Sequence, residues 1–119
     1  MAGLDILRLL NRRHYSDALE SHWSRPAVER LTRVIYAHDP MGLCGFGVPL
    51  DEYEPEALLC VAQLCGHSDV RLFLATAEGA PGGDAAQVRA ALRASFEELF
   101  GAGAPKASCA LVADVLKAL

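Results

Sequence analysis

One long irregular segment, residues 36–56, constrains the fold of this chain more than any other stretch. It contains three of the six prolines, three of the ten glycines and two of the three tyrosines, whereas the sequence on both sides is patterned as amphipathic helix. A long irregular segment inside a compact domain is either functional or a clasp packed by its own side chains. We therefore expect an ordered loop over about residues 38–55 that serves one of these two purposes.

The sequence before the loop predicts a helix of about three turns. Ser24 is a good N-cap, and Pro26 stands in the first turn, where its missing N–H costs nothing. Pro40 ends the helix, because a proline excludes the preceding residue, Asp39, from the α region. Between these limits the apolar residues recur on one face at helical spacing: Val28, Leu31, Val34 and Ile35.

The sequence after the loop predicts a buried central helix. Glu54, Pro55 and Glu56 restart the helix, with proline at its first position and acids near the positive end of the helix dipole. Gly66 stops it. The residues between are apolar on more than one face, which is typical of an interior helix: Leu58, Leu59, Val61, Ala62, Leu64 and Cys65.

Three further helices are predicted toward the C-terminus. Ser68 or Asp69 caps a short one that ends before a glycine-rich stretch. Asp84, followed three residues later by Gln87, forms a capping-box pattern at the start of the next, and Pro105 opens the last. No segment shows the alternation of a strand. We therefore expect an all-α fold, a compact bundle of five or six short helices with one long ordered loop.

Length and charge bound the class of protein. A chain of 119 residues fits a single helical domain over residues 1–119. The net charge of −4 weighs against a nucleic-acid binder, which must neutralise many phosphates. No apolar run approaches the ~18 residues that span a bilayer, and Asp5 and Arg8 interrupt the apolar start, which therefore does not resemble a signal peptide. We expect a cytoplasmic protein with no membrane partner.

The cysteines do not predict a metal or cofactor site. Cys60, Cys65 and His67 lie close in sequence, but their spacing differs from a zinc knuckle and no second ligand pair follows. On an apolar helix, buried structural thiols are the better interpretation. Cys44 lies near two glycines, so a reactive thiol with His38 as its base is an alternative, although no catalytic signature surrounds it.

Four residues near the end of the loop form a candidate partner-binding set: Asp51, Glu52, Tyr53 and Glu54. Carboxylates there can meet arginines or lysines of a basic protein partner, but they can also simply cap and solvate a helix start, which accounts for Glu54 and Glu56. Tyr53 is either an exposed hot spot or a ring folded onto the core with its hydroxyl outside.

The start of the loop carries three candidate structuring residues: Asp39, Pro40 and Gly42. Directly after a helix, the Asp39 carboxylate can accept backbone N–H groups of the turn formed by Pro40, Met41 and Gly42. We therefore expect Asp39 to fold the loop back.

The loop motif resembles a pattern of the YugE-like family of small bacterial helical proteins. The similar residues are His38-Asp39-Pro40-Met41-Gly42-Leu43, Val48-Pro49 and Asp51-Glu52-Tyr53-Glu54-Pro55-Glu56, with a helix end at Phe96-Glu97-Glu98-Leu99-Phe100-Gly101. The similarity spans roughly residues 28–101, and it departs from the family at Cys44, Gly45 and Glu54. It implies an all-α fold and brings no assigned activity.

Together these patterns favour a non-enzymatic protein-interaction module that binds a basic partner through residues 38–56. Its sharpest version is an immunity or antitoxin-type protein, by analogy of size and charge alone. The alternatives are a small enzyme or thiol sensor using Cys44 with His38, and an accessory subunit that is stable only in an oligomer.

Overall fold

The computed structural model describes residues 17–42, 47–67, 69–101 and 105–119. These residues include five complete α-helices and a short 3-10 helix: α2 (Arg25–His38), η2 (Leu50–Tyr53), α3 (Glu54–Leu64), α4 (Val70–Leu74), α5 (Ala85–Phe100) and α6 (Cys109–Ala118). Residues 17–20 are helical as well. No strand occurs among the described residues. The predicted all-α fold is therefore confirmed, while the predicted features at residues 1–16 and at Cys44, Ser68 and Gly45 lie outside the described residues.

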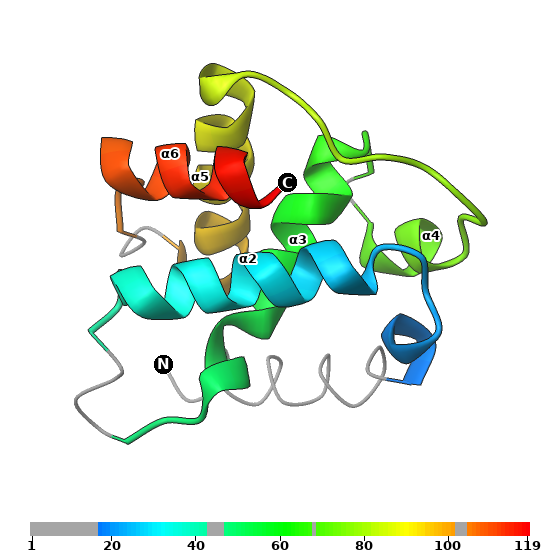
Figure 1. The fold of residues 1–119 in the computed structure, drawn as a ribbon, viewed down its shortest axis with the longest axis horizontal. Helices are drawn as coiled ribbons and strands as arrows, with labels where there is room; N and C mark the ends of the chain where they lie inside the picture. Colours follow the sequence, from blue (N-terminus) through cyan, green and yellow to red (C-terminus); the bar gives the residue numbers. More distant parts are fainter. Residues whose placement is uncertain (1–16, 43–46, 68, 102–104) are drawn as a thin grey trace.

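Helix α3 is the centre of the bundle, as its apolar pattern predicts. It packs between α2 and α5, and α6 lies against α2 and α5 (Figure 1). Seven of its eleven residues are buried: Pro55, Glu56, Ala57, Leu58, Cys60, Val61 and Ala62. Burial of this apolar surface is the main favourable contribution to folding. None of the helices in the described part of the chain is long and apolar enough to cross a membrane.

Local capping signals set several helix ends where the sequence predicts them. Asp84 Oδ1 accepts the Gln87 backbone N–H at 2.9 Å, and Gln87 Oε1 accepts the Asp84 N–H at 2.8 Å, which completes the capping box of α5. The Asp69 carboxylate accepts the Arg71 N–H at 2.8 Å at the start of α4. After α5, Gly101 has φ of +66°, a left-handed conformation that suits glycine.

Of two further predicted helix starts, one is confirmed in position and one is wrong. Ser24 is the N-cap residue of α2, with Pro26 in the first turn, as predicted. The Ser24 side chain makes no capping bond to α2; its Oγ lies 2.7 Å from His22 Nδ1 instead. The last helix begins at Cys109 rather than at Pro105, because the Ser108 hydroxyl accepts the Leu111 N–H at 3.1 Å and caps the helix there. Of the two possible start signals before α6, Pro105 and Ser108, the one whose side chain caps the helix sets the boundary.

A cluster of polar bonds holds helix α4 against the start of α2; we call His22 and Trp23 with their contacts the 22–23 clamp. His22 Nε2 lies 3.2 Å from the Phe73 carbonyl oxygen and 3.1 Å from that of Thr76, which assigns the proton to Nε2. The Trp23 indole N–H also donates to the Thr76 carbonyl at 3.0 Å. The Trp23 and His22 rings pack on the buried Phe73 ring. The clamp therefore joins segments far apart in the chain.

Helix α6 is fastened to α2 by two polar contacts. His38 Nε2 lies 2.7 Å from Asp114 Oδ2, and Arg30 Nε donates to the Ala118 carbonyl at 2.6 Å. His38 also stands in the last turn of α2, where a positive charge is favourable to the helix dipole. These polar contacts add to the burial of two side chains of α6 itself, Val112 and Val115.

Candidate partner-binding surface

A hydrogen-bonded group joins the two ends of the loop between α2 and α3; we call it the Asp39–Tyr53 clasp. The Tyr53 hydroxyl donates to Asp39 Oδ1 at 2.7 Å, and its oxygen accepts the Met41 backbone N–H at 3.1 Å. The Gly42 N–H donates to the Asp39 carbonyl oxygen at 3.0 Å, which tightens the turn. The Tyr53 phenol group thereby joins the two ends of the loop. The Tyr36 hydroxyl also bonds across the loop, donating to the Val48 carbonyl oxygen at 3.1 Å.

Asp39 adopts an unusual backbone conformation at this point. Its φ of 48° and ψ of 57° place it in the left-handed region, and among the described residues it is the only non-glycine with positive φ. Aspartate tolerates this region better than most residues, and the conformation costs of order 1–3 kcal/mol unless its surroundings support it. The bond from Tyr53 supplies such support. Asp39 thus accepts the Tyr53 hydroxyl proton, and the Met41 N–H donates to that same hydroxyl. That Asp39 folds the loop back stays a prediction.

Tyr53 belongs to the core. Its side chain is fully buried, and its hydroxyl points to Asp39 within the loop. Of the two predicted alternatives for Tyr53, the ring lies in the core, but its hydroxyl is not outside as that alternative had it. The prediction that Tyr53 contacts a partner directly does not fit this burial, because a hot-spot side chain must be reachable in the free protein.

The other three residues of the predicted set lie at the surface around η2. Asp51 is exposed, whereas Glu52 and Glu54 are half-buried. The neighbouring Leu50 keeps half of its side chain exposed (50%), one of the two largest apolar exposures among the described residues. We call this group, Leu50, Asp51, Glu52 and Glu54, the η2 surface. It combines an accessible apolar side chain with carboxylates.

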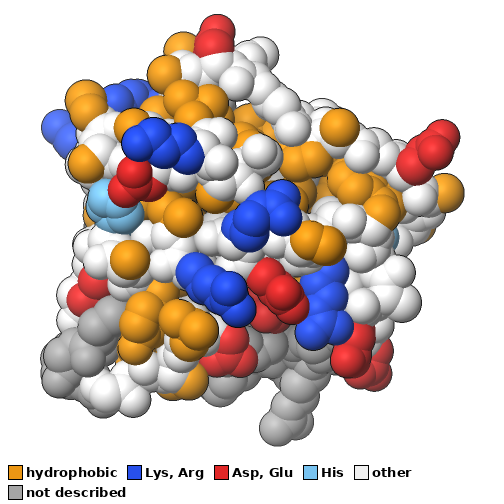
Figure 2. All heavy atoms as spheres, in the orientation of Figure 1, with side chains coloured by type: hydrophobic (Ala, Val, Ile, Leu, Met, Phe, Trp, Pro, Cys, Tyr) orange, Lys and Arg blue, Asp and Glu red, His pale blue; other side chains and the backbone are white. Residues whose placement is uncertain are grey.

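A surface hollow of about 290 Å³ lies between the η2 surface and α2. It is lined by Glu29, Thr32, Arg33, Leu50, Asp51 and Glu54. Figure 2 shows positive and negative side chains alternating along α2 on this side of the molecule, where the hydrophobic side chains of the loop region adjoin them. Arg25 donates to Glu29 at 2.8 Å, so the negative charge of Glu29 is already partly balanced within α2. The hollow thus offers apolar contact and net negative charge together.

Glu56 does not share the exposure of its acidic neighbours. Its side chain is completely buried in the first turn of α3. The interpretation that Glu56 is a solvated helix-start residue is therefore wrong, although its place in the first turn remains favourable to the helix dipole. Helix α3 as a whole is contacted by η2, α2 and α5, which fits its buried character.

The cysteines of α3 are buried or partly buried thiols. Burial raises the pKa of Cys60 to about 12, and it also raises the pKa of Cys65. Thiols with raised pKa values stay protonated near neutral pH and make poor nucleophiles and poor metal ligands. In the described part of the chain, no three His, Cys, Asp or Glu side chains gather in a way that would hold a metal ion.

The predicted pair of Cys44 and His38 is only half described, because Cys44 lies outside the described residues. His38 contacts Asp114 on α6, an arrangement that the sequence analysis missed. The Leu50 exposure was also missed. The available signal for the His38–Asp114 contact was an aspartate in the mostly apolar last helix, whereas nothing in the sequence marks Leu50 as exposed.

No protein-family model matches this chain, and no curated protein or solved structure is significantly similar to it. The resemblance to the YugE-like family therefore stays a prediction.

Proposed function

We propose that this chain is a non-enzymatic helical interaction module that binds a basic protein partner through the η2 surface. The observation that supports the proposal is the half-exposed Leu50, set beside Asp51 and a hollow that Glu29, Arg33 and Glu54 also line. Exposed apolar side chains rimmed by polar groups are typical of protein-interaction sites.

The charge and the rigidity of this region favour a basic partner. Three carboxylates and one guanidinium line the hollow, and the whole chain carries a net charge of −4. Complementary charge accelerates association with a positively charged partner. The Asp39–Tyr53 clasp fixes the end of the loop before binding, so less conformational entropy is lost on association.

The finer proposal is an immunity or antitoxin-type protein of the bacterial cytoplasm. Its support is the small size and the acidic charge, which is an analogy and carries no site chemistry. It makes a specific prediction for the partner: expression of the partner alone should arrest growth, and co-expression of this chain should restore it. If the partner is harmless when expressed alone, the immunity role is rejected, and the proposal of an interaction module is unaffected.

The test begins with a partner captured from the source organism and purified. The double reversal Asp51→Lys with Glu52→Lys should slow its association, and the loss should shrink as salt rises. The control is Asp17→Lys with Glu78→Lys, two exposed acids away from η2 that change the net charge equally. Leu50→Ala should instead raise the dissociation rate, because it removes apolar contact area.

The proposal fails if the η2 reversal associates as fast as the control variant at low salt. Circular dichroism must show parent-like helicity in every variant. Since Asp51 and Glu52 precede α3, their reversal should change the stability by only about 0.3–1 kcal/mol through the helix dipole.

The second candidate is a small enzyme or thiol sensor that uses Cys44 with His38. One observation favours it: Asp114 contacts His38 Nε2, and a carboxylate that orients an imidazole is a feature of nucleophilic sites. Thiol labelling of a Cys109→Ser variant near neutral pH tests it, because Cys60 and Cys65 are kept protonated by burial and Cys109 is exposed. Labelling of Cys44 faster than a small model thiol would support this candidate, and labelling at or below that rate would exclude it.

A further inference from the structure

The outer face of α5 has small side chains at regular spacing. Ala86 and Ala90 are exposed and Ala94 is half-buried, and residues four apart lie one above the other on a helix. The exposed Arg93 and Glu97 stand on the same side. We call these five residues the α5 face. Alanines at such positions let the backbone of a second helix approach closely.

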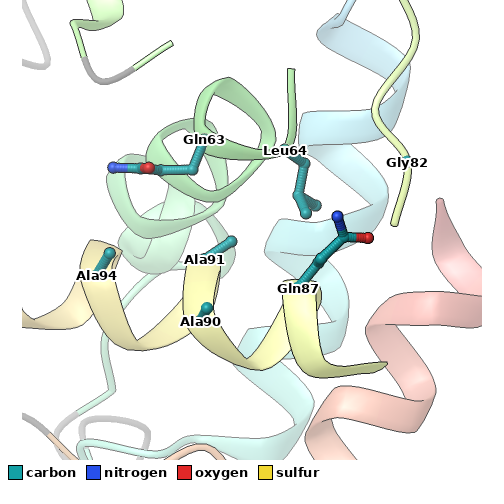
Figure 3. Close-up of a pocket in the computed structure, with 7 residues that line it drawn as sticks. All are labelled: Gln63, Leu64, Gly82, Gln87, Ala90, Ala91 and Ala94. Carbon is teal, nitrogen blue, oxygen red and sulfur yellow. The ribbon is translucent and has the colours of Figure 1, made fainter. Parts of the chain in front are cut away.

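A groove runs beside the α5 face, between α5 and the end of α3. Its volume is about 380 Å³, and it is lined by Gln63, Leu64, Gly82, Gln87, Ala90, Ala91 and Ala94. Figure 3 shows Ala91 and Ala94 pointing toward α3, with Leu64 pointing back toward Gln87. The lining is therefore mostly apolar, with amide groups at its sides. A groove of this kind next to an exposed helix face has room for side chains of a docked helix.

The charges along α5 indicate which helix docks there. Along the helix two arginines, Arg89 and Arg93, come before two glutamates, Glu97 and Glu98. This helix therefore lacks the negative excess of the whole chain, whose net charge is −4. A face with an excess of one sign would favour a partner of the other sign, whereas a helix on which the positive charges all precede the negative ones complements an antiparallel copy of itself.

Two antiparallel α5 helices would bring Arg93 of each copy close to Glu97 of the other. In an antiparallel arrangement about a two-fold axis near Ala94, Arg93 of one copy lies within about one helical turn of Glu97 of the other. Within one copy, Arg93 Nε and Glu97 Oε1 are 2.9 Å apart, and both side chains are well exposed (74% and 51%), so they can exchange partners without breaking core contacts. Arg89 is used differently, since it donates to the Ala107 carbonyl at 2.6 Å.

We propose that this chain forms a homodimer in which the α5 faces of two copies pack antiparallel, each beside the α3–α5 groove of the other. The partner on this surface is thus the α5 helix of a second copy, which packs along the α5 face at the edge of the groove. This surface is separate from the η2 surface, and the dimer does not depend on the proposed basic partner.

Size-exclusion chromatography with light scattering tests the dimer over a wide range of protein concentration. The parent should show twice the monomer mass at the highest concentrations and dissociate on dilution. Ala90→Arg should reduce the mass to that of the monomer by placing a long charged side chain in the contact. The matched control is Ala113→Arg on the exposed side of α6, which should leave the dimer unchanged. A monomeric parent at every concentration overturns the proposal, and so does an equal effect of the two variants.

Charge exchange between copies identifies the antiparallel pairing. Arg93→Glu alone and Glu97→Arg alone should each be monomeric, because each places like charges opposite one another across the axis. An equimolar mixture of the two variants should recover the dimer mass, since both contacts between copies are then of opposite charge. The pair within one helix cannot be restored by mixing, so an effect on helix stability alone predicts no recovery. Failure of the mixture to recover the mass overturns the proposed pairing.

Discussion

Two irregular connections of this protein are closed in different ways. The α2–α3 loop is closed by its own ends, through the Tyr53 hydroxyl and Asp39, which are 14 positions apart. The α4–α5 loop is held from outside by His22 and Trp23, which precede it by more than 50 positions. The first closure ends on a fully buried ring and the second on half-buried rings. From this comparison we expect the loop that is closed from within to depend strongly on its buried ring, and the loop that is held from outside to open locally.

The largest effect should come from removing the buried ring of the first loop. Tyr53→Ala should lower the free energy of unfolding by about 3–5 kcal/mol, because it deletes a buried aromatic ring and leaves a cavity. Tyr53→Phe keeps the ring and removes only the hydroxyl, so it should cost about 1–2 kcal/mol. Urea unfolding followed by circular dichroism measures both. A loss of less than about 1 kcal/mol for Tyr53→Ala would show that the Tyr53 ring does not stabilise the closed α2–α3 loop.

Loss of the 22–23 clamp should lower the free energy of unfolding less, and its effect should be confined to the region around α4. Trp23→Ala should cost about 2 kcal/mol, below the range for fully buried aromatic rings, because Trp23 is only partly buried. Amide hydrogen exchange should accelerate in α4 while α3 keeps its protection, since α4 is held by the Thr76 and Phe73 carbonyl contacts. Equal acceleration in α3 and α4 would mean that the clamp opens only with the whole domain, and the contrast between the two loops would then disappear.

In the Asp39–Tyr53 clasp, substitution of Asp39 should lower the stability less than substitution of Tyr53. Asp39→Ala should cost about 1–2 kcal/mol, through loss of the bond from Tyr53 and the left-handed backbone that alanine adopts less readily. Asp39→Asn should cost less, because asparagine tolerates the same backbone and its amide oxygen can accept the hydroxyl proton. Denaturant midpoints rank the two variants; a larger loss for asparagine than for alanine would contradict this account of Asp39.

The smallest changes in stability are expected at two glycines of the α4–α5 loop, Gly79 and Gly82, and they should have opposite signs. A Cβ at Gly79 would lie 3.0 Å from Trp23 Cζ2, so Gly79→Ala should destabilise by about 1 kcal/mol as the indole ring shifts. A Cβ at Gly82 would meet nothing within 4 Å, so Gly82→Ala should stabilise by about 0.4–1 kcal/mol through the unfolded chain. Thermal melts of both variants give the sign of each change. Equal signs would show that the indole ring is not held against residue 79.

Local signals predicted most of the helical frame, because the interactions that create it are local. The capping box of Asp84 and Gln87, the glycine at the end of α5 and the proline in the first turn of α3 all act within a few residues. The prediction failed where two local signals compete, as at the start of α6, where the Ser108 cap prevails over Pro105. Glu56 was misjudged because acids in a first turn are usually solvated, and here the helix is enclosed by its neighbours.

The candidate site was less predictable, because it depends on distant segments. His38 and Asp114 are 76 positions apart, and no pattern in the sequence brings them together. The acids around η2 were identified from their clustering, but whether Tyr53 points inward or outward depends on the partner its hydroxyl finds, which is Asp39. Side-chain direction at an irregular segment follows from tertiary contacts rather than from helical or strand periodicity.

The position of the chain's single tryptophan has a spectroscopic consequence. Trp23 packs between Phe73, His22 and the backbone at Gly79, away from the centre of α3. Its fluorescence emission therefore reports on the docking of α4, whereas far-ultraviolet circular dichroism reports on the whole set of helices. An emission change that comes before the loss of helicity would reveal partial opening at this end of the molecule, and coincident curves would indicate a single cooperative unit.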